Sequence, residues 1–278
     1  MSHLDLMRIR VNGTDLAYVE QGSGEPVLFV HGTCTDWRLW DLFRPAVAAR
    51  YRFISYSRRY HQPNAWPDDG ALYSYQQHGA DLVAFTRALC TEPVHVVGLS
   101  YGALLVVRAA IEHPELFRSV CAYDPPISDL LVDWPGGRSA LEERARAFAS
   151  IKGALLDGPV MDAIQMAYDW FEGETGAFAR ISPQLRQCIL ENAGTLRPQL
   201  MQPLPPPPTA CETLASLKVP LLAMTGERSP TYFALVHSAM AHCLPVGATA
   251  KVIGGNSHVP LSRPDTFIEA VLEFIAAH

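Results

Sequence analysis

The chain has 278 residues, of which 49% are hydrophobic and 18% charged, and its formal net charge at pH 7 is −6. The hydrophobic fraction excludes a disordered chain, and the small share of charged residues excludes a coiled coil. The net negative charge, with no basic cluster longer than Arg58-Arg59, argues against a dedicated nucleic-acid binder. The length suits one large α/β domain or two small ones.

No segment has the pattern of a targeting sequence or a membrane span. The first residues, MSHLDLMRIRVNG, lack the apolar core of a signal peptide, and no run of 18 uncharged apolar residues follows. We therefore expect a soluble, cytoplasmic protein. Without CxxC or Cys/His spacing we expect no metal site, and we interpret the cysteines as free thiols, a disulfide remaining the alternative. The six are Cys34, Cys90, Cys121, Cys188, Cys211 and Cys243.

Short apolar runs alternate with helix-like stretches along most of the chain. Strands are predicted at 16–20, 26–30, 52–56, 94–97, 119–123, 220–224 and 250–253. Helices are predicted at 75–89, 103–112, 231–242 and 266–275, and Asn12-Gly13 predicts a hairpin turn before the first strand. This alternation predicts a mainly parallel sheet covered by helices on both faces, with ligands bound at the carboxyl ends of its strands.

The alternation stops between about residues 128 and 212. Helical patterns occur there at 141–148, 161–171 and 183–192, with no strand-like run. The stretch ends in PLPPPP at 203–208, which must be extended because each proline fixes φ and cannot continue a helix; we interpret it as a stiff connector. The sequence therefore predicts a core of residues 1–127 and 213–278, with residues 128–212 inserted as a helical cap.

The sequence Gly98-Leu-Ser-Tyr-Gly102 directly follows a predicted strand and opens a predicted helix. A G-x-S-x-G pattern in this context is typical of a nucleophile elbow, where the flanking glycines give room for a serine in strained backbone geometry. Ser100 is therefore the predicted nucleophile. The alternative is a tight glycine turn followed by an ordinary helix-capping serine.

A serine hydroxyl is a poor nucleophile unless a base accepts its proton. Of the ten histidines, His258 follows the last predicted strand, at the same sheet edge as Ser100, and is the predicted base. His31-Gly32-Thr33 also leaves a strand at this edge. We expect the backbone amides of Thr33 and Tyr101 to form the oxyanion hole, and His31 to brace its loop.

Three motifs together resemble the α/β-hydrolase family. They are HG at 31–32, GLSYG at 98–102 and SHVPLSRPDTF at 257–267, and they occur in the family's order. The resemblance covers nearly the whole chain outside the cap. It implies an α/β-hydrolase fold, with an eight-stranded, mostly parallel sheet, and a catalytic triad in the chain order serine, acid, histidine.

The identity of the acid is the open question within this resemblance. In most family members an aspartate follows the strand at 220–224 in a G-x-x-D loop, but here Ser229 occupies that position. One candidate is Asp124, after the strand at 119–123, where some haloalkane dehalogenases and cofactor-free quinolone dioxygenases of the superfamily carry their acid. The other candidate is Glu227. We favour Asp124, which would fix the imidazole tautomer and stabilise its protonated form.

The loop after residue 56 and the cap supply the candidates for substrate contact. Arg58 and Arg59 partly match the family's D-x-R-G-x-G pattern, and we expect either one to pair with a carboxylate and pin this loop. The candidate substrate-binding residues are Tyr60, His61, Trp66, Trp134 and Tyr168. An apolar lid over a triad excludes water, so we expect a mainly apolar small-molecule substrate.

The leading prediction is a serine hydrolase that cleaves an ester, lactone or thioester through an acyl-enzyme on Ser100. A cofactor-free dioxygenase or a C–C bond hydrolase using the same residues is the alternative, and a non-catalytic ligand receptor is another. Epoxide hydrolases and haloalkane dehalogenases use an aspartate nucleophile, which a serine at position 100 disfavours. No phosphate-binding glycine pattern occurs in its proper context, so we expect no cofactor. The oligomeric state stays open.

Overall fold

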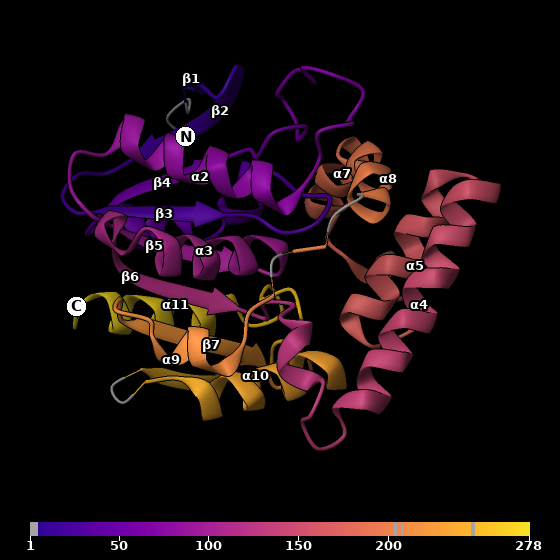
Figure 1. Cartoon of the computed structure of the whole chain (residues 1–278). Coiled ribbons are helices and arrows are strands. Elements are labelled where there is room, and N and C mark those ends of the chain that lie inside the picture. Colours follow the sequence, from indigo (N-terminus) through magenta and orange to yellow (C-terminus); the bar gives the residue numbers. More distant parts are fainter. Residues whose placement is uncertain (1–4, 203–204, 207, 246–247) are drawn as a thin grey trace.

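The computed structural model describes residues 5–202, 205–206, 208–245 and 248–278, and its centre is an eight-stranded sheet (Figure 1). The strand order is β1-β2-β4-β3-β5-β6-β7-β8, in which β1, β2 and β4 pair antiparallel and the remaining pairs are parallel. The predicted mostly parallel sheet is confirmed. The strands are β1 (Met7–Val11), β2 (Thr14–Gln21), β3 (Pro26–Val30), β4 (Arg52–Tyr56), β5 (Val94–Leu99), β6 (Phe117–Tyr123), β7 (Leu221–Gly226) and β8 (Thr249–Ile253).

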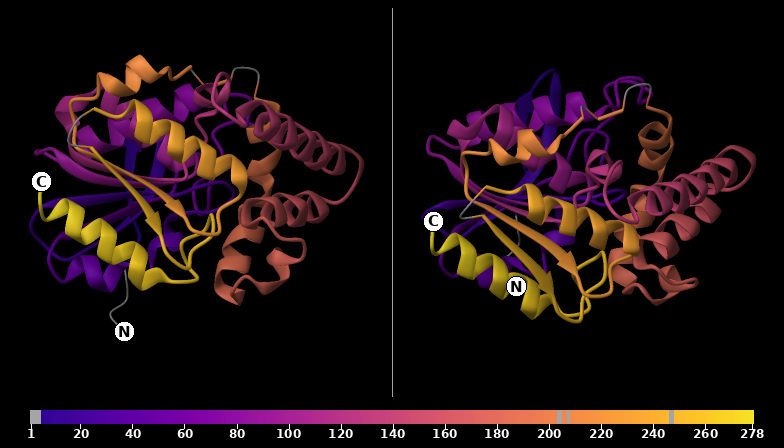
Figure 2. Two further views of the ribbon diagram at one scale, coloured as in Figure 1. Left: turned by 90° about the horizontal axis from the view of Figure 1, so that it is seen from below. Right: turned by 60° about the horizontal axis from the view of Figure 1, so that its bottom comes forward.

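Helices cover both faces of this sheet (Figures 1 and 2). One face packs against α2 (Tyr75–Leu89), α3 (Tyr101–Glu112), α9 (Cys211–Ala215) and α10 (Thr231–Cys243). The other packs against α1 (Arg44–Ala48) and α11 (Pro264–Ile275). All four helices predicted for the core are therefore present, and their ends differ from the prediction by at most two residues.

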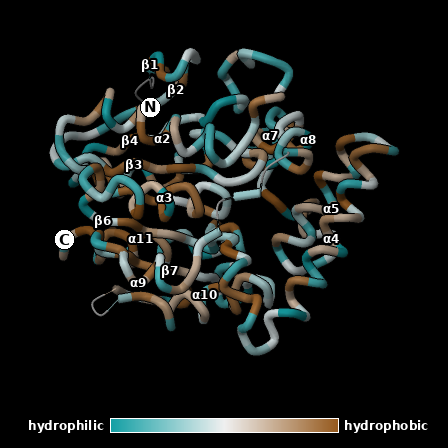
Figure 3. The backbone as a smooth tube through the Cα atoms, viewed as in Figure 1, coloured by the Kyte–Doolittle hydropathy of each residue, from teal (hydrophilic) through white to brown (hydrophobic). Residues whose placement is uncertain are grey.

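Strand β3 shows why the sheet is covered twice. All five of its residues are buried, and successive side chains of a strand point to opposite faces. Leu28 and Val30 accordingly belong to the apolar layer under α2 and α3, whereas Val27 and Phe29 belong to the layer under α1 and α11. Strand β3 is coloured brown, for hydrophobic residues, in Figure 3, as its continuous apolar run predicts.

Between β6 and β7 the chain forms a group of helices, here called the helical segment. Its members are α4 (Gly137–Asp157), α5 (Val160–Glu172), α6 (Ala177–Arg180), α7 (Pro183–Glu191) and α8 (Leu196–Met201). They lie on the side toward which the arrowheads of β3 and β6 point (Figure 1). Ile151, Ile164 and Ile189 form an apolar cluster of this segment, joined by Cys34 from the loop after β3. Its division from the core at residues 128 and 212 stays a prediction.

Short 3₁₀ turns complete the secondary structure, at Trp37–Trp40, Pro114–Leu116, Ser128–Leu131 and Ala193–Thr195. Within the proline tract predicted to be extended, residues 203, 204 and 207 lie outside the described residues. Pro205, Pro206 and Pro208 belong to no helix or strand. Across the described ranges, no helix has both the length and the apolar character that crossing a bilayer requires.

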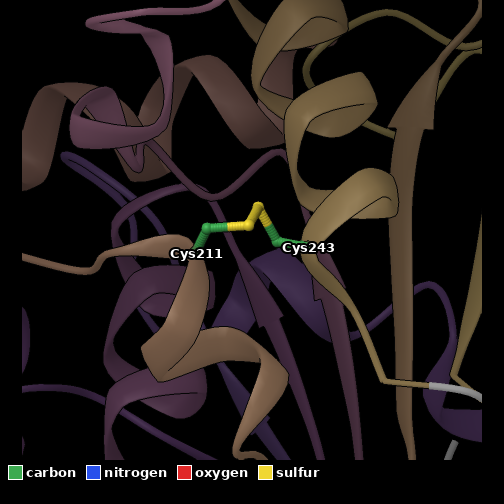
Figure 4. The surroundings of a disulfide bond; sticks show 2 residues. All are labelled: Cys211 and Cys243. Atoms are coloured by element: carbon green, nitrogen blue, oxygen red, sulfur yellow. A yellow bond between two sulfur atoms is a disulfide. The ribbon is translucent and has the colours of Figure 1, made fainter.

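The prediction that every cysteine is a free thiol is wrong for two of the six. Cys211 on α9 and Cys243 at the end of α10 form a disulfide (Figure 4). The two residues are 32 positions apart, and only the packing of α9 against α10 brings them together, which no local pattern reveals. The other four cysteines are free. Disulfides are more usual in oxidising compartments, and the cytoplasmic location stays a prediction.

We expect the Cys211–Cys243 disulfide to contribute about 2–4 kcal/mol to the free energy of unfolding, because it closes a loop that is open in the reduced unfolded chain. Urea unfolding with and without dithiothreitol measures this contribution. The reductant should lower the midpoint of the wild-type chain and leave that of the Cys211→Ala/Cys243→Ala double variant unchanged. A wild-type midpoint that does not respond to the reductant contradicts the assignment.

Candidate active site

Ser100 occupies the turn between β5 and α3, with φ 53° and ψ −117°. A positive φ is costly for a residue with a Cβ, so the surrounding structure must impose it. The side chain of Ser100 makes no capping hydrogen bond to α3, which rules out the helix-capping alternative. The Ser100 hydroxyl has no hydrogen-bond partner among the described residues. It is therefore available to a ligand.

The two glycines of this turn permit very close packing. A Cβ on Gly102 would lie 2.3 Å from the carbonyl oxygen of Val30, and a Cβ on Gly98 would lie 2.7 Å from Cα of Ala103. Contacts this short cannot be accommodated without moving backbone. The G-x-S-x-G pattern thus brings the start of α3 directly against the end of β3.

A buried contact joins the imidazole of His258 to the carboxylate of Asp124. His258 Nδ1 lies 3.1 Å from Oδ2 of Asp124, and both residues are almost fully buried. Asp124 also has a positive φ, 49°, and its amide donates to the carbonyl of Met224 on β7. The carboxylate therefore projects from the end of β6 into the space beside the loop that carries His258.

Ser229, which occupies the position of the usual family aspartate, is part of this cluster. Its hydroxyl donates a hydrogen bond of 2.7 Å to Oδ2 of Asp124, the same oxygen that faces the imidazole. From the sequence Ser229 was expected only to be a missing acid, and this contact was not predicted. Glu227 is exposed and accepts a hydrogen bond from the amide of Gly255 at 2.7 Å instead. The imidazole thus contacts Asp124, the favoured candidate, and not Glu227.

His258 is held in place by contacts from three elements. The Tyr123 hydroxyl donates to the carbonyl of Ser257 at 2.6 Å, which ties the loop to the end of β6. The imidazole stacks on Phe233 of α10, with ring centroids 4.1 Å apart, and lies tilted against Phe171 of α5, with centroids 5.3 Å apart. Phe233 was not predicted from the sequence, because its place in a helical pattern indicates only that it is apolar. Since Nδ1 faces Asp124, Nε2 is the ring nitrogen left for the substrate side.

Ser100 and His258 line one small cavity of about 20 Å³, together with Gly32, Thr33 and Tyr168. The hydroxyl of Tyr168 donates to the carbonyl of Thr33 at 2.9 Å, and Nε2 of Gln199 donates to the Thr33 hydroxyl at 2.9 Å. Two helices of the helical segment therefore fix this loop. For the described part of the chain, the backbone amides of Thr33 and Tyr101 have no hydrogen-bond acceptor.

His31 braces the loop, as predicted. Its Nε2 accepts a hydrogen bond of 2.9 Å from the amide of Arg58, which leaves Nδ1–H to donate to the Gly32 carbonyl at 3.0 Å. Burial, and next the charge of Arg58, hold the pKa of His31 well below its usual value. The imidazole is therefore neutral and fixed in one tautomer.

The two arginines after β4 behave differently. Arg59 pairs with Asp81, with Nε 2.7 Å from the carboxylate, as predicted. For Arg58 the same prediction is wrong, because its buried guanidinium donates to the Gly32 carbonyl at 2.8 Å. The guanidinium carbon of Arg58 also lies 4.5 Å from the centroid of the Tyr101 ring. Arg58 therefore holds the peptide between Gly32 and Thr33 by its carbonyl oxygen. Within the described residues, the N–H of the same peptide, which belongs to Thr33, remains free to donate to a ligand.

Of the five predicted substrate contacts, the structure places Tyr168 at the cavity that contains Ser100. The other four line neither cavity found at Ser100 within the described residues. Tyr60 is buried, and its hydroxyl donates to the carboxylate of Asp68. His61 is also buried, and its ring centroid lies 4.6 Å from that of His31. Trp66 is exposed, and Trp134 packs on His242. A sequence pattern shows that a residue is aromatic, but not which side of its loop faces the ligand.

A second cavity at Ser100 has a volume of about 210 Å³. Aromatic side chains form much of its wall, among them Tyr75, Phe148, Trp170, Phe171 and Phe233. Neutral polar groups come from Gln199 and Gln202, and one cation comes from Arg144. Glu172, which follows Phe171 at the end of α5, accepts a hydrogen bond from the Ser257 hydroxyl, and burial raises the pKa of Glu172. Neither Glu172 nor Arg144 was predicted from the sequence.

The described residues contain no group of three or more His, Cys, Asp or Glu side chains arranged to hold a metal ion. The groups that converge at the strand ends are instead a hydroxyl, an imidazole and a carboxylate. Such a set can activate the hydroxyl for attack on an electrophilic carbon. Thr33 and Tyr101, whose amides are candidate oxyanion donors, line the larger of the two cavities at Ser100.

Comparisons with known proteins show which proteins this chain is similar to. A sequence profile described as "Alpha/beta hydrolase family" matches residues 27–270. A 2-(acetamidomethylene)succinate hydrolase of Mesorhizobium japonicum is 26% identical over 99% of this chain and 96% of its own. An epoxide hydrolase of Caballeronia sordidicola is 32% identical over 50% of this chain and 40% of its own. The structure of a carboxylesterase from Bacillus subtilis superimposes with a TM-score of 0.79 at 16% identity, covering 99% of this chain and 93% of that one.

The close packing at the elbow gives a stability prediction. Gly102→Ala should destabilise the fold by about 1–3 kcal/mol or more, because its methyl group collides with backbone of β3. Gly153→Ala is the matched control: it lies inside α4 with open space around it and should stabilise the fold by up to about 1 kcal/mol. Urea unfolding of both variants measures the two effects. An unchanged midpoint for Gly102→Ala would refute the packing described here.

Proposed function

Because the chain belongs to the alpha/beta hydrolase family, we propose that it is a serine hydrolase that cleaves a carboxylic ester, lactone or thioester. The observation that carries the proposal is the buried contact between His258 Nδ1 and Asp124 Oδ2, in a site whose cavity also contains Ser100. The carboxylesterase with the same fold supports ester chemistry, and the 2-(acetamidomethylene)succinate hydrolase supports hydrolysis of a small molecule. A serine at the elbow disfavours epoxide opening.

In the proposed reaction the Ser100 hydroxyl oxygen attacks the substrate carbonyl carbon, and its proton passes to Nε2 of His258. Asp124 accepts the hydrogen bond from Nδ1–H and stabilises the imidazolium without taking the proton. The carbonyl oxygen becomes an oxyanion, which the amides of Thr33 and Tyr101 stabilise. When the carbon–oxygen or carbon–sulfur bond breaks, the leaving group receives the proton from His258. Water, activated by the same imidazole, then releases the acid and restores Ser100.

The helical segment acts in this proposal as a cap. Tyr168 and Gln199 position the loop that contributes the Thr33 amide, and Phe171 covers one face of the His258 ring. These contacts exclude water from the imidazole–carboxylate pair, so the pair interacts in a surrounding of low polarity. The active site is therefore complete only when the helical segment is packed on the sheet.

Substitutions of the three groups test the mechanism with p-nitrophenyl esters. Ser100→Ala should abolish turnover, and Asp124→Asn should lower kcat by a factor on the order of 10⁴, because the imidazole loses its tautomer-fixing partner. Glu227→Gln should retain wild-type activity, since the Glu227 side chain has one hydrogen bond among the described residues, from the backbone amide of Gly255. Near-full activity of Asp124→Asn combined with loss in Glu227→Gln would contradict the assignment. Oxygen uptake without ester cleavage would favour the dioxygenase alternative.

Arg58 gives a separate prediction for the oxyanion hole. Arg58→Met removes a donor from the Gly32 carbonyl, so the Gly32–Thr33 peptide is less well oriented, and kcat should fall about tenfold with little change in KM. Arg59→Met is the control, because it removes an equally buried guanidinium whose partner is Asp81. That variant should lose stability but keep kcat. Equal losses of kcat in both variants would show that Arg58 has only a structural role.

A further inference from the structure

Arg144 is the one charged residue in the wall of the 210 Å³ cavity at Ser100, as far as the described residues show. It projects from α4 of the helical segment and is half-buried. Its neighbours in the wall are aromatic, aliphatic or neutral polar side chains. A single cation in a cavity of this kind is a feature that packing alone does not require, because a neutral side chain would fill the same space without a desolvation cost.

No carboxylate of the described residues lies within 4.0 Å of the Arg144 guanidinium, although Arg146 on the same helix pairs with Glu142. The nine residues outside the described ranges contain no aspartate or glutamate, so the sequence offers no hidden partner. Arg144 instead lies against two rings, with its guanidinium carbon 4.5 Å from the ring centroid of Phe148 and 5.2 Å from that of Tyr232. These contacts hold the guanidinium at the cavity but leave its N–H donors without an anionic acceptor.

We propose that Arg144 binds a carboxylate of the substrate while Ser100 attacks a carbonyl at the other end of the same molecule. This inference rests on the proposed function and narrows its substrate class to half-esters, or related acyl compounds, of small dicarboxylic acids. A guanidinium presents two parallel N–H donors that match the two oxygens of a carboxylate. The aromatic side chains of the same cavity wall suit the short hydrocarbon chain that separates the two groups.

The size of the cavity agrees with this assignment. Its 210 Å³ is smaller than the roughly 300–1,000 Å³ typical of pockets for drug-sized ligands. The substrate is therefore a small acid. The inference also revises the expectation of a mainly apolar substrate, which was based on an apolar lid. The sequence did not indicate a role for Arg144, because the pattern of residues 141–148 does not show which side of α4 faces Ser100.

Paired substrates that differ only in a terminal charge test the proposal. Each mono-p-nitrophenyl ester of succinate, glutarate or adipate is compared with the ester of butyrate, valerate or caproate, which has the same chain length. Background hydrolysis is subtracted with the Ser100→Ala variant. For at least one chain length the wild-type kcat/KM should be roughly 10- to 100-fold higher for the charged ester, as expected for a charge-assisted hydrogen-bonded pair. In Arg144→Gln this ratio should fall to about one.

Arg146→Gln is the matched control, because Arg146 is an exposed cation on the same helix and should not alter the ratio. If the wild type hydrolyses the neutral esters but shows no preference at any length, or if Arg144→Gln keeps the wild-type ratio, the inference is wrong while the proposed function stands. If none of the esters is cleaved, the proposed function fails. Carboxylate binding is then tested by thermal unfolding with glutarate: a rise in Tm seen in the wild type and absent in Arg144→Gln supports the site, and no rise contradicts it.

Discussion

The contact between His258 Nδ1 and Asp124 Oδ2 is the interaction on which the arrangement of this site depends. It joins the end of β6 to the loop after β8, and Ser229, after β7, donates to the same carboxylate oxygen. Three neighbouring strand ends are therefore connected through one buried carboxylate. Because an unpaired carboxylate in this position would be costly, the two contacts to Oδ2 of Asp124 also fix the position of the imidazole. The other carboxylate oxygen, Oδ1, is buried without a hydrogen-bond partner among the described residues.

The helical segment contributes as much to the site as the sheet does. Tyr168 and Gln199 hold Thr33, Phe171 covers the imidazole, and Arg144 brings a charge into the larger cavity. In the proposed function the sheet thus supplies the reacting groups, whereas the helical segment supplies cavity walls and a charge for the substrate. Arg144, which contacts none of the groups at the strand ends among the described residues, is the position in the helical segment where a change would affect the substrate most selectively.

Local patterns in the sequence predicted those features whose backbone conformation depends on neighbouring residues. The apolar run of β3 and the glycines around Ser100 each specify a short piece of backbone, and the structure has both. Contacts between distant segments were not predictable in the same way. The donation from Ser229 to Asp124 spans 105 residues and the Cys211–Cys243 disulfide spans 32, and each depends on how separate elements pack. Asp124 was identified only because the family resemblance limited the choice to two carboxylates.

The central claim is that Ser100 is a nucleophile activated by His258, and covalent labelling measures this most directly. Intact chain and a His258→Ala variant are incubated with a fluorophosphonate, and the adduct is located by peptide mass spectrometry. The account predicts one adduct per wild-type chain, attached to Ser100, and labelling of the variant slowed by orders of magnitude. A folded wild-type chain that is not labelled, or is labelled at another residue, would contradict it.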